Sequence, residues 1–149
     1  MRWQKVKVKR IYSIRRLRLI VNYLIKDDEY FLSLLDDKKD RFFYLFDKAI
    51  YVGGAKFYVF YVNDLPVSCV GLNRKTKTVR FFFIDKSYRR RMTIEFILNF
   101  IHRKIGFYFY MGTIIDNKRF IYFCKKNNWD VYYKDDNDII FKICQQEGY

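Results

Sequence analysis

Basic side chains that could bind phosphate gather in two short stretches of the sequence. Eight lie between residues 74 and 91, where Asp85 is the single acid, and eight more lie in the first 25 residues, which contain no acid. The whole chain carries a formal net charge of +14, a surplus well above what solubility requires. Guanidinium and ammonium groups form charge-assisted hydrogen bonds with phosphate oxygens, so we expect an anionic partner. The residues singled out for nucleic-acid or other anion contact are Arg15, Arg16, Arg18, Arg74, Lys75 and Lys77.

The charge alone does not identify the anion. Nucleic acid, an acidic protein surface, a membrane face and a phosphate-bearing cofactor all remain open as the anionic partner. The alternative explanation for the positive charge is a drift of the composition towards Lys, Asn, Ile, Tyr and Phe, which would have no functional meaning. The hydrophobic fraction of 51% and the aromatic fraction of 21% exclude a disordered basic tail. A length of 149 residues predicts a single domain, 1–149, that buries its own core.

Few side chains suit acid–base or metal chemistry. His102, the single histidine, has no Ser or Cys partner nearby in the sequence, and we interpret it as a surface or boundary residue rather than a base. The acids Asp27–Glu29 lack the spacing of a calcium loop and better suit the first turn of a helix. The cysteines Cys69, Cys124 and Cys144 form no C-x-x-C pair, so no metal site and no disulfide framework is expected.

Hydrophobic periodicity predicts the elements that must position these groups. Residues 1–55 form a basic segment with a strand over Lys5–Lys9 and helices over Arg15–Ile25, around Tyr30–Leu35 and over Arg41–Ala49, the last two separated by a break at Asp36–Asp40. Residues 56–143 form the remaining core, with strands at Lys56–Val62, Val67–Leu72, Thr78–Ile84, Phe107–Met111, Val131–Tyr133 and Ile139–Ile143, a turn at Asn63–Pro66, and helices over Arg89–Arg103 and from Asp116 or Asn117 to Lys126. Short turns make the first three of these strands antiparallel neighbours. The expected fold is a single α/β domain with a mixed, mostly antiparallel sheet flanked by helices.

Two stretches of the sequence resemble the signatures of one enzyme family. The stretch from Ile84 to Leu98 resembles the acyl-CoA signature of the GNAT superfamily of N-acyltransferases, V-x-P-x-Y-R-G-x-G-I-G-x-x-L-L, with Tyr88-Arg89 at the Y-R pair. The stretch 117–129 resembles the second signature, N-x-x-A-I-x-F-Y-x-K-x-G-F. The positions that fit the second signature are Asn117, Ile121, Phe123, Lys126 and Trp129. The order of elements agrees with the family over 56–143.

The resemblance implies a splayed sheet that holds acetyl-CoA and transfers its acetyl group to an amine. It implies that backbone groups near Phe83 and Ile84 position the thioester. Glu95 is implied as a base for the amine, although we favour a solvated or ion-paired helix residue. Cys124 replaces the usual tyrosine acid, and we favour a small core residue there. The cofactor-binding residues implied are Ile84, Arg89, Arg90, Arg91, Met92, Thr93, Ile94 and Asn117.

The glycines of the first signature are absent, because Arg90, Met92 and Ile94 replace them. Glycine lets the backbone N–H groups at a helix N-terminus approach a phosphate closely, and a β-branched Ile94 would crowd that approach. The arginines Arg89–Arg91 could bind the phosphates through their side chains instead. Two functions therefore remain open. The chain could be an acyltransferase, or it could be a GNAT-like domain that has lost CoA chemistry and acts as a structural component of a phage virion or as a nucleic-acid-binding component. A GNAT-like enzyme that modifies DNA is a third, weaker alternative.

The aromatic runs and the basic N-terminus add two further expectations. Phe81–Phe83 and Phe107–Tyr110 could stack nucleic-acid bases, but strand alternation places at least half of these rings in the core. Arg15, Arg16 and Arg18 interrupt the apolar residues of 11–25, so neither a signal segment nor a membrane span is expected. We expect the protein in the cytoplasm or within a virion or other larger assembly.

Overall fold

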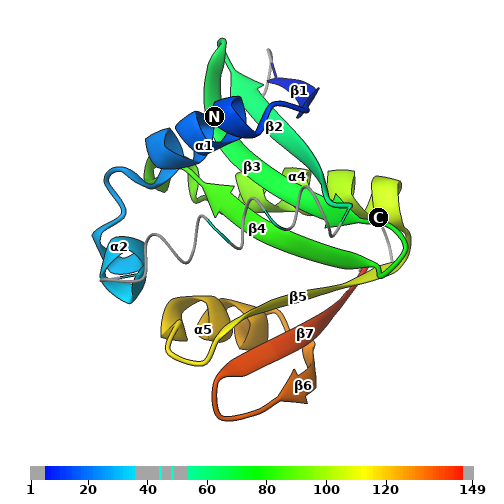
Figure 1. Cartoon of the computed structure of the whole chain (residues 1–149). Helices are drawn as coiled ribbons and strands as arrows, with labels where there is room; N and C mark the ends of the chain where they lie inside the picture. The colour runs from blue at the N-terminus through cyan, green and yellow to red at the C-terminus, as the bar shows by residue number, and fades with distance from the viewer. Residues whose placement is uncertain (1–5, 36–43, 45–47, 49–53, 146–149) are drawn as a thin grey trace.

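The computed structural model describes residues 6–35, 44, 48 and 54–145, which form a mixed sheet with helices on both faces (Figure 1). The sheet has seven strands in the order β1-β2-β3-β4-β5-β7-β6. The strands are β1 (Val6–Ile11), β2 (Lys56–Val62), β3 (Leu65–Asn73), β4 (Thr78–Ile84), β5 (Tyr108–Ile114), β6 (Asp130–Lys134) and β7 (Asp138–Cys144). The helices are α1 (Ile14–Ile25), α2 (Glu29–Leu35), α4 (Arg91–Ile105) and α5 (Lys118–Lys126), with a 3-10 turn at Lys86–Tyr88. The predicted fold class is confirmed.

The parallel pair β4 and β5 divides the sheet into two halves. Every other pair of neighbours is antiparallel. The strands β4 and β5 pair at two positions, Thr78 with Tyr110 and Val79 with Met111. Beyond these pairs the two strands diverge towards their C-terminal ends, so the half-sheets β1–β4 and β5–β7 separate (Figure 1).

A bulge bends β4 where it leaves β5. Val70 of β3 stands opposite both Phe81 and Phe82 of β4, which is the two-against-one arrangement of a β-bulge. Phe81 has φ 58°, a left-handed conformation that bulky residues rarely adopt. Gly71 of β3 permits close contact there, because a Cβ on this residue would lie 2.8 Å from the carbonyl oxygen of Arg80.

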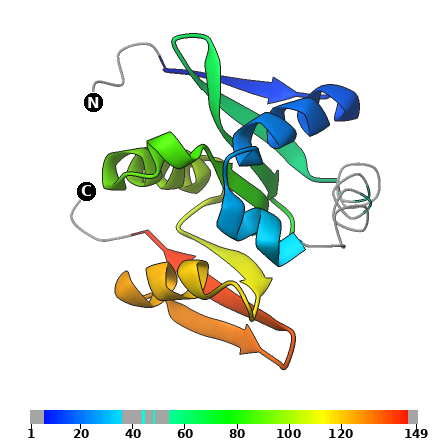
Figure 2. The same ribbon diagram turned by 90° about the vertical axis from the view of Figure 1, so that its left-hand side faces the viewer.

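The helices form one layer on each face of the sheet (Figure 2). On one face, α1 packs against β2, β3 and β4 through the apolar residues predicted from its periodicity, among them Leu17, Val21 and Leu24. Ser13 caps α1 by accepting a hydrogen bond from the Arg16 N–H at 3.2 Å. On the other face, α4 and α5 share the larger core, and Ile97 of α4 is completely buried there.

Some predicted boundaries differ from the structure for local reasons. The helix expected from Arg89 begins at Arg91, because the 3-10 turn precedes it and Arg90 is extended with φ −118°. Leu65 and Pro66 open β3 rather than completing a turn, since Asn63 and Asp64 form a tight turn with φ 51° and 66°. The expected break at 36–40 lies outside the described residues, as does the expected helix at 41–49 apart from residues 44 and 48.

Candidate active site

The diverging ends of β4 and β5 open into a cleft of about 1310 Å³. Its walls come from both half-sheets and from the N-terminal regions of α4 and α5, while α2 faces it across the open end. Among the predicted cofactor-binding residues, Ile84, Arg89, Ile94 and Asn117 line this cleft. Strands that diverge leave their edge N–H and C=O groups without a strand partner, so the cleft offers polar backbone atoms as well as apolar side chains.

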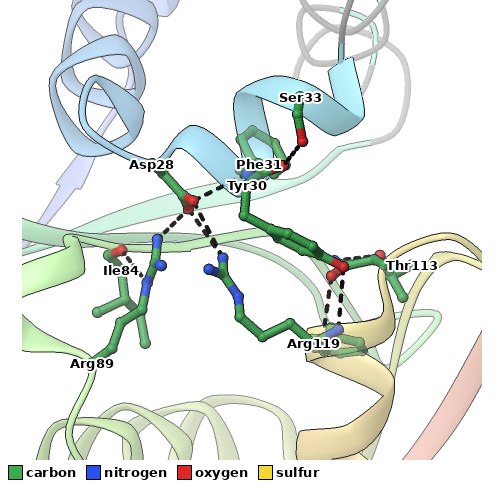
Figure 3. Close-up of polar contacts among 10 residues, drawn as sticks. Asp28, Tyr30, Phe31, Ser33, Ile84, Arg89, Thr113 and Arg119 are labelled. Atoms are coloured by element: carbon green, nitrogen blue, oxygen red, sulfur yellow. Dashed lines mark hydrogen bonds and ion pairs between the residues drawn. The ribbon is translucent and has the colours of Figure 1, made fainter.

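A buried carboxylate, Asp28, bridges the two sides of the open end (Figure 3). Asp28 precedes α2 and is 4% exposed. Its Oδ2 accepts a hydrogen bond from the Arg89 guanidinium, which follows β4, and lies 3.2 Å from Nη2 of Arg119 on α5. Its Oδ1 caps α2 by accepting from the Phe31 N–H at 3.0 Å. Burial alone would raise the pKa of Asp28, but the Phe31 N–H and the two guanidinium groups together lower it below its ordinary value.

Arg89 lines the cleft, and its guanidinium group is hydrogen-bonded to other groups of the protein. Its Nε donates to the carbonyl oxygen of Ile84 at 3.1 Å, and its terminal nitrogen donates to Asp28. The arginine at the Y-R pair therefore connects the end of β4 to the α1–α2 connection. Of the predicted triplet, Arg90 and Arg91 are the members whose side chains are exposed at the start of α4.

The N-terminus of α4 has no side-chain cap. Arg90 occupies the N-cap position, and no side chain accepts a hydrogen bond from the first turn. The first intrahelical bond there runs from the Ile94 N–H to the Arg90 carbonyl at 3.0 Å, so the N–H groups of residues 91–93 precede the helical ladder. None of Arg90, Met92 and Ile94 has a positive φ, so the backbone here does not require the glycines of the family pattern.

Two further predicted residues occupy the ends of these helices. Thr93 is completely buried, and its hydroxyl has no partner among the described residues. Asn117 caps α5 by accepting from the Phe120 N–H at 3.3 Å, and its Nδ2 donates to Oγ1 of Thr113 at 3.0 Å. Of the two residues at which the sequence allows this helix to begin, Asp116 and Asn117, it is Asn117 that caps α5 and joins it to the end of β5.

The two predicted catalytic residues lie away from the main cleft. Glu95 accepts a hydrogen bond from Nε of Arg91 at 2.9 Å and lines a second, adjoining cleft of about 410 Å³ between α4 and α5. Cys124 is completely buried in the core, where burial raises the pKa of its thiol to about 12. These positions agree with the roles favoured from the sequence, an ion-paired helix residue and a small core residue.

His102 is buried, which corrects the prediction of a surface or boundary residue. Its ring packs 4.9 Å from the ring of Phe109, centroid to centroid, and its Nδ1 lies 2.9 Å from the carbonyl oxygen of Gly106. Burial lowers the pKa of His102, partly offset by the bond to Gly106. The His102 side chain therefore contacts the C-terminal end of α4 through Gly106, and it does not line the main cleft.

The three cysteines are free thiols with different accessibility: Cys69 and Cys124 are buried and Cys144 is exposed. Burial raises the pKa of both buried thiols, so their reactive thiolate forms are scarce. We expect Ellman's reagent to modify one thiol per folded chain rapidly and all three after unfolding in guanidinium chloride. Cys144→Ser should abolish the rapid phase, and two rapid thiols in the folded protein would contradict this assignment.

The remaining predicted anion contacts lie on two separate elements. Arg15, Arg16 and Arg18 lie on the exposed side of α1, and Arg74 and Lys75 are exposed in the turn between β3 and β4. Lys77, at the end of that turn, lies over the ring of Tyr108. The described part of the chain contains no group of three or more His, Cys, Asp or Glu side chains placed to hold a metal ion. It also contains no helix that is both long and apolar enough to cross a bilayer.

The fold and the cleft define a protein with the architecture of the GNAT N-acetyltransferases. An acetyltransferase from Streptococcus agalactiae superposes with a TM-score of 0.61 at 18% identity, covering 95% of this chain and 99% of that one. The N-acetyltransferase PseH from Campylobacter jejuni, in complex with acetyl coenzyme A, gives 0.61 at 13% identity, over 95% and 100%. A protein of Desulfovibrio desulfuricans assigned to the GNAT family of acetyltransferases gives 0.59 at 15% identity, over 94% and 99%.

These likenesses are structural. No family model matches the sequence, and the search of curated proteins finds no match. The chain has the GNAT fold over nearly its whole length, which confirms the resemblance inferred from the two signatures. The comparisons give no support to a phage or virion component.

Proposed function

We propose that the chain binds acyl-CoA in the cleft between β4 and β5 and transfers the acyl group to an amine. The observation that carries this proposal is the divergence of β4 from β5 into a cleft that Ile94, in the uncapped first turn of α4, helps to line. Solved structures with the same fold are acetyltransferases, and one of them holds acetyl coenzyme A. Acyl-CoA supplies an activated acyl group as a thioester.

The groups at the start of α4 fit a diphosphate. The N–H groups of residues 91–93 point out of the helix end, where the helix dipole favours an anion. The exposed guanidinium group of Arg90 can add charge-assisted hydrogen bonds, and so can the terminal nitrogens of Arg91, whose Nε is bonded to Glu95 and whose side chain lines the neighbouring cleft. This arrangement replaces the close backbone approach that glycines allow. Met92 is 59% exposed, so its side chain can turn away from the phosphates.

The end of β4 fits the amide groups of a pantetheine arm. The Asp85 N–H donates to the Val67 carbonyl on β3 at 2.9 Å. Because successive residues of a strand direct their backbone groups to opposite edges, Ile84 directs its N–H and C=O towards the cleft. The Ile84 carbonyl already accepts from Arg89, which leaves its N–H for the ligand.

We do not assign the proton of the amine to Glu95, because Glu95 is bonded to Arg91 and lines the other cleft. Asp28 lines the main cleft, but its carboxylate is bound by Arg89 and Arg119 and its pKa is lowered. A carboxylate held in this way is a weak base. We infer that water in the cleft accepts the proton that the amine loses.

Calorimetric titration with acetyl-CoA and with CoA tests this proposal. We expect saturable binding, and we expect the double variant Arg90→Gln/Arg91→Gln to bind at least about tenfold more weakly, since a hydrogen bond to a charged group contributes about 1.5–3 kcal/mol. Arg15→Gln/Arg16→Gln on α1 is the matched control, because it removes the same charge away from the cleft. An absence of binding heat at near-millimolar cofactor would exclude the proposal, and equal weakening by both double variants would exclude the assigned phosphate site.

A further inference from the structure

Three tyrosines form a continuous row across the C-terminal half-sheet. Tyr108 and Tyr110 of β5 have ring centroids 5.7 Å apart, and Tyr132 of β6 lies 4.4 Å from Tyr110. We call Tyr108, Tyr110 and Tyr132 the tyrosine row. A bulge between Val131 and Tyr133 brings Tyr132 into this position.

The tyrosine row lies on the face of the half-sheet opposite to α5. Phe109 and Met111 of β5 are buried in the core shared with α4 and α5. Strand alternation therefore places Tyr108 and Tyr110 on the other face. Tyr132 is 62% exposed, so a flat ligand can reach its ring.

Two lysines lie against the tyrosine row. Nζ of Lys77 lies 4.3 Å and Nζ of Lys142 lies 4.5 Å from the ring centroid of Tyr108. No acid among the described residues lies within ion-pair distance of either ammonium group. The exposed Arg80 of β4 lines the main cleft, and so do two members of the row, Tyr110 and Tyr132, so this surface is continuous with the cleft. The surface therefore combines aromatic rings with two ammonium groups that form no ion pair among the described residues, although Asp130 of β6 stands opposite Lys142 of β7 in the sheet register.

We propose that the tyrosine row and its two lysines bind single-stranded nucleic acid. Bases of any sequence stack on aromatic side chains, and neighbouring cations bind the phosphates. An open antiparallel sheet face with exposed aromatics is one of the architectures that present such rings to unpaired bases. A duplex keeps its bases stacked within the helix, so this surface favours the single strand. A second copy of the chain would bring like charges together and is disfavoured.

Fluorescence anisotropy with a labelled oligothymidylate tests this proposal without any acyl cofactor, so its outcome is separate from that of the proposed acyltransferase function. Tyr132→Ala should weaken binding about tenfold, the loss expected for one stacked base, and Tyr132→Phe should retain it. Lys77→Gln and Lys142→Gln should each reduce the slope of log affinity against log salt by about 0.7. Because Tyr132 is largely exposed, Tyr132→Ala should fold with an unchanged Tm.

The matched controls are Tyr122→Ala, which removes a tyrosine that is 69% exposed on α5, and Lys125→Gln on the same helix. Both should bind the oligonucleotide like the wild type, apart from a small general effect of the lost charge. Equal affinity for a duplex of the same length would overturn the proposal. Unchanged binding by Tyr132→Ala would overturn it too, as would a dimer, found by sedimentation, that Tyr132→Ala dissociates.

Discussion

Replacing Asp28 with alanine should lower the free energy of unfolding by about 3 kcal/mol. The substitution leaves the guanidinium groups of Arg89 and Arg119 without their shared carboxylate, and it removes the cap of α2. The side chain of Arg89 is only 26% exposed, so water cannot fully replace the lost partner. Urea unfolding followed by circular dichroism measures the change.

The neighbouring acid provides a matched control. Asp27→Ala removes the same charge from an exposed side chain, so its effect should stay within about 0.5 kcal/mol. Asp28→Asn should fall between the wild type and Asp28→Ala, because its amide oxygen can still cap α2 while the charge is lost. Equal stability of Asp27→Ala and Asp28→Ala would show that the bridge contributes nothing.

The same carboxylate gives a pH dependence of defined sign. Burial acts to raise the pKa of Asp28, but its hydrogen bonds and the two guanidinium groups outweigh burial and lower it. A group with a lowered folded pKa stabilises the protein fully above its unfolded value of about 3.9 and loses this contribution as pH falls through the folded value. The stability difference between wild type and Asp28→Asn should therefore be constant near neutral pH and shrink below about pH 4.

Gly71→Ala should lower the free energy of unfolding by about 2–3 kcal/mol. A Cβ at this position would lie 2.8 Å from the carbonyl oxygen of Arg80 and 2.8 Å from the ring of Phe57, which is 1% exposed. Neither neighbour can move freely, because one is strand backbone and the other is core. Since Arg80 adjoins the bulge that bends β4, the variant should also weaken cofactor binding in the cleft.

Two comparisons separate crowding from a general effect of adding a methyl group. A Cβ added at Gly112 on β5 would lie 3.0 and 3.1 Å from its nearest neighbours, against 2.8 Å at Gly71. Gly112→Ala should therefore lower the free energy of unfolding by less than Gly71→Ala. In a double-mutant cycle, Phe57→Leu should relieve part of the cost of Gly71→Ala, which gives a favourable coupling energy. A Gly71→Ala variant as stable as the wild type would contradict the close packing at the bulge.

Local patterns in the sequence predict most of the elements but not the contacts between distant ones. The apolar spacing of Leu17, Val21 and Leu24 predicts the buried side of α1, and all three are buried. The acidic run before α2 predicts a helix cap, which Asp28 provides. Asp28 pairs with Arg89, which is 61 positions away in the sequence, and with Arg119, which is 91 positions away. Hydrophobic periodicity describes only neighbouring residues, so it cannot predict these contacts.

The bulge and the tyrosine row escaped prediction for related reasons. Phe81 lies in an uninterrupted aromatic run that is typical of a regular strand, and no glycine or proline marks its left-handed conformation. Tyr110 of β5 and Tyr132 of β6 meet across β7, which lies between these two strands and pairs with both. His102 follows a core position of α4, and its burial depends on Phe109 from the next strand.

The two halves of the sheet are joined to each other by a short contact between β4 and β5. Two residue pairs join the half-sheets there, so a small rotation about this line changes the angle between them while the longer antiparallel ladders stay intact. Asp28 connects the opposite, open ends through Arg89 and Arg119. One carboxylate therefore links the two sides of the cleft at its open end, where the sheet itself provides no pairing.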